Sequence, residues 1–150
     1  MTKEEIKDFS LRITQSSKTE LVVVTYDIII NYLEAAKNSF KEDNIEEFIF
    51  NVKKAKQFIN DLSSNLDFHY KLSFDLMSLY LYANKCLVSA QVKKTDEKLD
   101  SVIDVISGLK IGFLEVAKED VRGLAMPNSS QVYVGLTYGK TSKLNEYSVR

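Results

Sequence analysis

Residues 45–66 of the chain read IEEFIFNVKKAKQFINDLSSNL. Apolar side chains recur in this stretch at alternating steps of three and four residues: Ile45, Phe48, Val52, Ala55, Ile59, Leu62 and Leu66. This period places them on one side of an α-helix and does not fit the two-residue alternation of a half-buried strand. The stretch therefore predicts a helix that packs along the seam of a helical bundle.

Three other stretches show the same period. The first begins at a capping-box pattern, Ser17-Lys18-Thr19-Glu20, ends between Lys41 and Asn44, and carries two adjacent stripes: Leu21, Val24, Ile28 and Tyr32, and Val22, Ile29, Leu33 and Ala36. The second follows a polar turn over residues 65–73, ends at 93–95, and carries Leu76, Leu79, Ala83, Cys86 and Ala90. The third follows an N-cap at 95–97 and carries Leu99, Val102, Ile106, Leu109, Phe113 and Val116.

Glycine and proline are unevenly distributed. All 5 glycines and the 1 proline lie at or after Gly108. Sandwiches, barrels and Rossmann-type units need these residues at tight turns, so such folds are excluded for residues 1–107. We expect an all-α, antiparallel up-down four-helix bundle over residues 1–122, with an N-terminal arm or short helix before Ser17.

The composition changes at residues 123–150, which form the second predicted unit. Gly123 and Pro127 end the last helix, and QVYVGLTYG follows at 131–139. We expect a non-helical extension here. The pattern fits extended or hairpin-like segments, and it also fits an unstructured tail that orders on a partner.

Charge and cysteine usage limit the function classes. The net charge is −1, which gives no electrostatic basis for binding nucleic acid or an anionic membrane. One cysteine excludes a disulfide framework, and the charged N-terminus lacks the apolar core of a signal peptide. We expect a cytoplasmic protein whose associations depend on apolar contacts.

Residues for catalysis or cofactor binding are sparse. The single His69 is expected in a turn, and Cys86 is expected to be a buried structural thiol. Zinc sites of the Cys/His kind and di-iron sites with Glu-x-x-His pairs are excluded, and no glycine-rich phosphate loop is present. We therefore expect no enzyme activity, no metal and no cofactor. The Gly108-x-x-x-Gly112 spacing favours close helix packing, with a groove for another helix as the alternative.

An excess of apolar residues is the least ordinary feature. The helices over 17–44 and 74–93 carry apolar side chains around most of their circumference, including Leu76, Met77, Leu79, Tyr80, Leu81 and Tyr82 on the latter. One interpretation is a wide core covered by the N-terminal arm. The other is a hydrophobic groove for partner helices.

Several stretches resemble, in order and spacing, the FliS family of flagellar secretion chaperones. They are residues 19–27 (TELVVVTYD), Ala35-Ala36, residues 54–62 (KAKQFINDL), Leu66-Asp67, residues 79–82 (LYLY) and Ala90. Tyr26 matches the family's Leu-Tyr position although Thr25 precedes it, and Leu79, Tyr80 and Tyr82 match its Leu-Tyr-x-Tyr stretch. The resemblance covers Ile13 to Ala117.

The resemblance implies a cytoplasmic bundle that binds the C-terminal helices of flagellin, prevents premature polymerisation and aids delivery to the export apparatus. With the apolar excess, it predicts a flagellin-binding groove formed by Tyr26, Ile29, Leu33, Ala55, Ile59, Leu76, Leu79, Tyr80 and Tyr82. In the free protein Phe9 and Ile13 are expected to cover part of this groove. Oligomeric state is left open.

Two other function classes stay open. A histidine phosphotransfer domain is also a small helical bundle, but it needs a solvent-facing histidine within a helix, followed by Lys and Gly. Here His69-Tyr70-Lys71-Leu72-Ser73 has no glycine and falls at a predicted turn. The other alternative is a structural or regulatory bundle of the same descent that binds a different partner.

Overall fold

The computed structural model describes residues 1–15 and 18–122, without the side chains of residues 13–15, 18, 116, 117 and 119–122. This part of the chain consists of helices and short connections: α1 (Lys3–Gln15), α2 (Lys18–Lys41), α3 (Ile45–Ser64), α4 (Lys71–Lys93) and α5 (Leu99–Arg122). The prediction of an all-α fold is confirmed. Residues 123–150 lie outside the described residues. The predictions of a non-helical extension and of a domain boundary at residue 123 therefore stay predictions.

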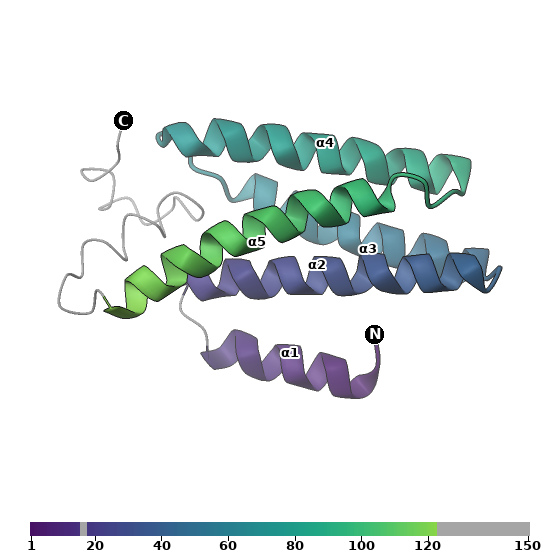
Figure 1. Cartoon of the computed structure of the whole chain (residues 1–150), viewed down its shortest axis with the longest axis horizontal. Coiled ribbons are helices and arrows are strands. Elements are labelled where there is room, and N and C mark those ends of the chain that lie inside the picture. The colour runs from purple at the N-terminus through teal and green to yellow at the C-terminus, as the bar shows by residue number, and fades with distance from the viewer. Residues whose placement is uncertain (16–17, 123–150) are drawn as a thin grey trace.

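The four long helices form an antiparallel up-down bundle (Figure 1). Helix α2 packs most extensively against α3 and α5, and α4 completes the ring between α3 and α5. The α4–α5 contact is the least extensive of the four. Figure 1 shows why: α5 starts beside the end of α4 and crosses the bundle obliquely towards the start of α2. Helix α1 lies outside the ring, against α2.

The predicted seams form the core. On α3 the side chains of Phe48, Val52, Ala55, Ile59 and Leu62 are buried, as is Leu66 just after the helix, and on α5 those of Leu99, Val102, Ile106 and Phe113 are buried. The 3–4 spacing therefore identified the inward faces of both helices correctly. Cys86 is also buried, as predicted. A polar link crosses this apolar core, because the Tyr26 and Tyr80 hydroxyl oxygens lie 2.6 Å apart.

Two connections turn without glycine. Asp43, before α3, has φ 56°, and Lys94, which ends α4, has φ 53°; both backbones are left-handed. The N-cap of α3 is Asn44, whose side chain accepts a hydrogen bond from the Glu47 N–H at 3.2 Å. An asparagine side chain therefore caps the start of α3.

One boundary was wrong. Residues 65–73 were expected to form a turn, but α4 begins at Lys71. The Ser73 hydroxyl donates to the Asp67 carbonyl at 2.6 Å, and its N–H donates to the Tyr70 carbonyl at 3.1 Å. These bonds place residues 71–73 in the first helical turn, where serine side chains commonly satisfy loop and terminal groups.

The packing interpretation of Gly108 and Gly112 was also wrong. A methyl group added at either position would meet no atom within 4 Å among the described residues. Neither glycine is needed for a close helix contact in this structure, and both lie on the exposed side of α5. The alternative, an open surface that another segment can approach, stays a prediction.

Candidate binding surface

Helix α4 exposes more large apolar side chains than any other described helix. We call the exposed set the α4 surface: Leu72, Phe74, Leu79, Leu81, Tyr82, Val88 and Val92. Leu81 is 60% exposed and Val92 is 74% exposed. Single exposed apolar residues are normal, but a contiguous set on one element marks an interaction site.

The α4 surface has two sides. Phe74, Leu81 and Val88 follow one another at steps of seven, with Val92 four residues later, so they form an outer stripe. Leu72, Leu79 and Tyr82 form a second strip on the flank that faces α5. This orientation follows from the Tyr82 hydroxyl, which lies 2.7 Å from the hydroxyl of Ser101 on α5.

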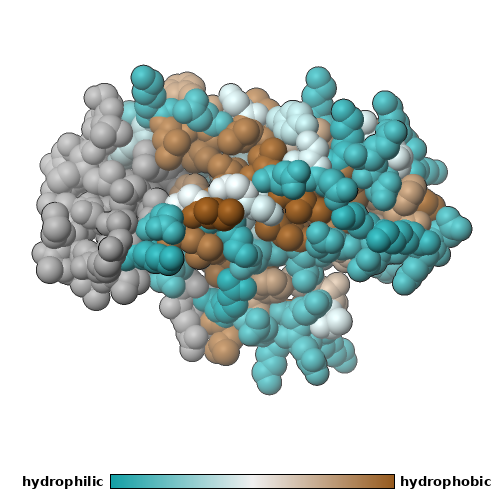
Figure 2. Space-filling view, in the orientation of Figure 1, coloured by the Kyte–Doolittle hydropathy of each residue, from teal (hydrophilic) through white to brown (hydrophobic). Residues whose placement is uncertain are grey.

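The surface carries little charge. From Leu72 to Val92 the charged residues are Asp75 and Lys85. Figure 2 shows apolar side chains gathered along the line where α4 and α5 face each other, with polar side chains around them. Gly108 and Gly112 of α5 leave this flank free of side-chain bulk. The arrangement suits an apolar partner segment and offers nothing to hold a phosphate or a metal ion.

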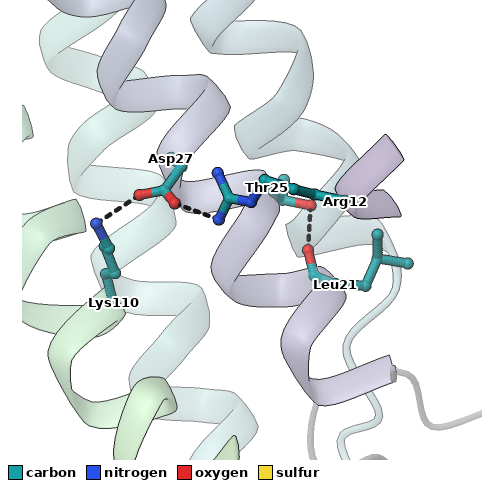
Figure 3. A network of polar contacts seen from close by, with 5 residues as sticks. All are labelled: Arg12, Leu21, Thr25, Asp27 and Lys110. Atoms are coloured by element: carbon teal, nitrogen blue, oxygen red, sulfur yellow. Dashed lines mark hydrogen bonds and ion pairs between the residues drawn. The ribbon is translucent and has the colours of Figure 1, made fainter. Parts of the chain in front are cut away.

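A three-residue ionic contact fixes α1 and α5 to α2 (Figure 3). Asp27 of α2 accepts from the Arg12 guanidinium at 2.7 Å through one carboxylate oxygen and pairs with the Lys110 ammonium at 2.6 Å through the other. The Asp27 side chain is 18% exposed, so these pairs are screened less than pairs at the surface. Asp27 is therefore shared by a helix of the bundle and by the outlying helix.

Helix α1 makes further polar contacts near its start. Thr2 and Glu5 form a capping box, and the Thr2 backbone hydrogen bond lowers the pKa of the Glu5 carboxyl below its ordinary value. The other Glu5 oxygen lies 3.5 Å from the Asn31 amide nitrogen on α2. The two ends of α1 thus each contact α2 through a carboxylate.

Beneath α1 lies an apolar face of α2 that is separate from the bundle core. Val24 and Ile28 are 3% and 5% exposed, although they do not belong to the core cluster. They precede Asn31 by seven and three residues, and Asn31 contacts α1. This spacing places the face under α1. The apolar excess of α2 is therefore buried from both sides, whereas the excess of α4 is exposed.

The predicted groove residues divide into two groups. Seven are buried in the core and cannot contact a partner in this arrangement: Tyr26, Ile29, Leu33, Ala55, Ile59, Leu76 and Tyr80. Leu79 and Tyr82 are 37% and 44% exposed and belong to the α4 surface. The structure thus places only two of the nine on an accessible surface. The hydroxyls of Tyr26 and Tyr80 instead contact each other and so link α2 to α4.

The predicted cover is on the opposite side of the bundle from α4. Phe9 is partly buried, its ring 5.5 Å from the Arg12 guanidinium carbon, while the side chain of Ile13 is outside the described residues. In Figure 1 α1 lies on the far side of α2 from α4. Its contacts are with α2, so it covers the α2 face of Val24 and Ile28.

The sequence analysis placed no residue of the outer stripe in the predicted groove: it named Leu81 only in the apolar excess and did not single out Phe74, Val88 and Val92. Their seven-residue recurrence was a usable signal. It was hidden because Leu76, Ala83 and Ala90 repeat at the same interval on the core side. When one helix carries two apolar stripes, the period alone does not show which stripe faces the core and which faces water.

Groups for other chemistries are isolated. His69 lies in the turn before α4, as predicted, with Nδ1 2.6 Å from the Asp67 carboxylate. Among the described residues no three His, Cys, Asp or Glu side chains cluster in a way that could hold a metal ion. The helices described are also too short or too polar to cross a membrane.

Comparisons with known proteins identify the family of the chain. A family model described as flagellar protein FliS matches residues 4–120. The chain belongs to the FliS family. A FliS relative, the flagellar secretion chaperone FliS of Campylobacter jejuni subsp. jejuni serotype O:6 (strain 81116 / NCTC 11828), is 24% identical over 102 residues. That alignment covers 67% of this chain and 80% of the relative. The FliS match includes α1, so the outlying helix is part of the family region.

Proposed function

We propose that this FliS-family protein is a cytoplasmic export chaperone that binds the C-terminal segment of flagellin. By occupying that segment it prevents premature polymerisation and assists delivery to the flagellar export apparatus. The observation that carries the proposal is the α4 surface, an exposed apolar face with two charged residues between Leu72 and Val92. Family membership and the name of the Campylobacter relative support the flagellar assignment.

The mechanism is helix-in-groove capture. An amphipathic segment that is unfolded before assembly places apolar anchors, three or four residues apart, against Leu79, Leu81 and Val88. Folding and binding occur together, so the ordering entropy is offset by apolar burial. The two sides of α4 allow the partner to pack on either flank of the helix. Lys85 lies on the outer stripe, four residues after Leu81 and three before Val88.

The buried members of the predicted groove act indirectly in this proposal. Tyr80 and Leu76 hold α4 against the core, while Leu79 and Tyr82 contact flagellin directly. A partner reaches the core residues only if the helices separate. Helix α1, with Phe9 and Ile13, is a removable cover over the α2 face of Val24 and Ile28, which provides a second apolar surface when α1 moves away.

The test is a binding titration with the C-terminal segment of the cognate flagellin. The Leu81→Asp variant should bind at least tenfold more weakly, because a charge is placed within the apolar contact. Gln57→Asp is the matched control: it adds the same charge at an exposed position on α3, and it should bind as the unaltered protein does. Absence of any complex with the unaltered protein at tens of micromolar excludes the proposal. Binding of a different partner, with no flagellin complex, favours the regulatory alternative.

A further inference from the structure

The segment that follows α5 is unusual in charge. Between Arg122 and Lys140 the chain has no charged residue, a run of 17 positions. The apolar members of this run include Leu124, Met126, Val132, Tyr133, Val134, Leu136 and Tyr138. A long uncharged segment of this kind needs an apolar surface to cover it in water.

The end of α5 limits how far the residues that follow it can be from α4. Helix α5 is described to Arg122, and in Figure 1 this end of α5 lies at the same end of the bundle as the start of α4. Because α5 crosses the bundle obliquely, its end lies further from α4 than its start does. A connection over residues 123–131 reaches about 30 Å when extended. The segment from Val132 onwards is therefore long enough to reach the α5-facing strip.

The chemistry and length of the two surfaces correspond. Leu72, Leu79 and Tyr82 lie on the α5-facing strip, which spans about 15 Å of helix. In an extended conformation, residues 132–138 span about 20 Å and place alternate side chains on one side: Val132, Val134, Leu136 and Tyr138. The α5-facing strip carries one charged residue, the exposed Asp75, which lies three residues after Leu72 and four before Leu79 on the same side of α4. Residues 132–138 carry no charge, so an extended segment must leave the Asp75 carboxylate open to water.

We propose that residues 131–139 dock in cis on the α5-facing strip of α4 in the free chain. The segment covers Leu72, Leu79 and Tyr82 and leaves the outer stripe of Leu81 and Val88 accessible. Docking itself does not depend on the proposed function. Its consequence does: if flagellin binds the α4 surface, the segment competes with flagellin for half of it, and the chaperone is partly self-inhibited.

Paramagnetic relaxation in the full chain tests the docking. A nitroxide is attached at Gly139→Cys, since Cys86 is 4% exposed and does not compete for the label. The amide signals of residues 72–82 should broaden strongly, whereas those of α3 should not. Leu136→Asp should remove the broadening. Thr137→Asp, the matched control on the other side of the extended segment, should retain it.

Three results overturn the proposal: no broadening of α4, broadening spread equally over α2 and α3, or broadening transferred to unlabelled chains in a mixed sample, which assigns the strip to a second copy.

A separate titration addresses the regulation. If one chain in ten is undocked, Leu136→Asp should bind the flagellin segment about tenfold more tightly than Thr137→Asp. Equal affinities overturn the self-inhibition. Failure of both variants to bind flagellin contradicts the proposed function and leaves the relaxation result unaffected.

Discussion

The hydroxyl oxygens of Tyr26 and Tyr80 lie 2.6 Å apart, joining α2 to α4 across the centre of the bundle. Both side chains are essentially inaccessible to water, and the Tyr26 ring also packs edge-on against Phe113. The bond therefore fixes the rotation of α4 relative to α2. That rotation decides which apolar residues of α4 face inwards and which form the α4 surface.

Replacing Tyr80 with Phe should lower the free energy of unfolding by about 1 kcal/mol, the usual net value of one buried hydrogen bond. Urea unfolding measures it. Tyr82→Phe is the control, because its exposed hydroxyl bond to Ser101 is worth less. In a double-mutant cycle, Tyr26→Phe should cost less in the Tyr80→Phe background than alone. Strict additivity would show that the two hydroxyls do not interact.

Leu81 and Ile29 should respond oppositely to a charge. Leu81 is exposed, so Leu81→Asp should change stability by less than about 0.5 kcal/mol while weakening flagellin binding. Ile29 is fully buried, and Ile29→Asp should cost more than about 3 kcal/mol and unfold much of the bundle. Circular dichroism and urea titration distinguish the two outcomes. If the Ile29→Asp protein folded and lost only flagellin binding, Ile29 would be part of the surface that contacts flagellin.

Arg12→Gln should loosen α1 without destabilising the bundle. The Arg12–Asp27 pair is partly exposed, so its removal costs no more than about 1 kcal/mol. Amide exchange should rise within α1 and remain unchanged in α3. Lys118→Gln removes the exposed pair with Glu115 and serves as the control. Unchanged exchange in α1 would mean that the Arg12–Asp27 pair does not hold this helix in place.

Gly108→Ala and Gly112→Ala should each stabilise the protein by about 0.5–1 kcal/mol. Both glycines lie inside α5, where alanine has the higher helix propensity, and no described atom lies within 4 Å of the added methyl group. Thermal and urea unfolding measure the gain. A loss of stability would show that some segment packs directly on these backbone positions in solution.

Lys94→Gly should also stabilise the chain, by about 1 kcal/mol. Lys94 ends α4 with φ 53°, a left-handed backbone that costs an L-residue with a side chain about 1–2 kcal/mol and glycine nothing. Lys93→Gly, one residue earlier inside the helix, should instead destabilise. Equal effects at both positions would indicate that α4 ends elsewhere in solution.

The fold followed from the sequence because its decisive signal is local. Phe48, Val52 and Ile59 repeat at helical period, and no competing apolar stripe exists on that helix. The partner faces of α2 and α4 were harder to assign. Tyr80 and Tyr82 are the same residue type two positions apart, yet one is buried and the other is exposed. Their assignment depends on how α4 is rotated in the bundle, which only the packing of all the helices determines.

The role of α1 was similarly beyond a local pattern. Val24 and Ile28 face away from the bundle core, and from sequence alone they fit an open groove as well as a covered face. The Arg12–Asp27 ion pair and the hydrogen bond from Asn31 to Glu5 decide the matter, but they join residues 15 and 26 positions apart. Period and composition carry no information about such pairs.

Because Asp27 serves both Arg12 and Lys110, the positions of α1 and α5 are thermodynamically linked. When α1 leaves, the carboxylate keeps one cation, and its attraction for Lys110 is no longer shared. Any ligand that displaces α1 thus alters the energy of moving α5, and by reciprocity any ligand that moves α5 alters the affinity for α1. One carboxylate thus connects the movement of an outlying helix with the movement of a helix of the bundle.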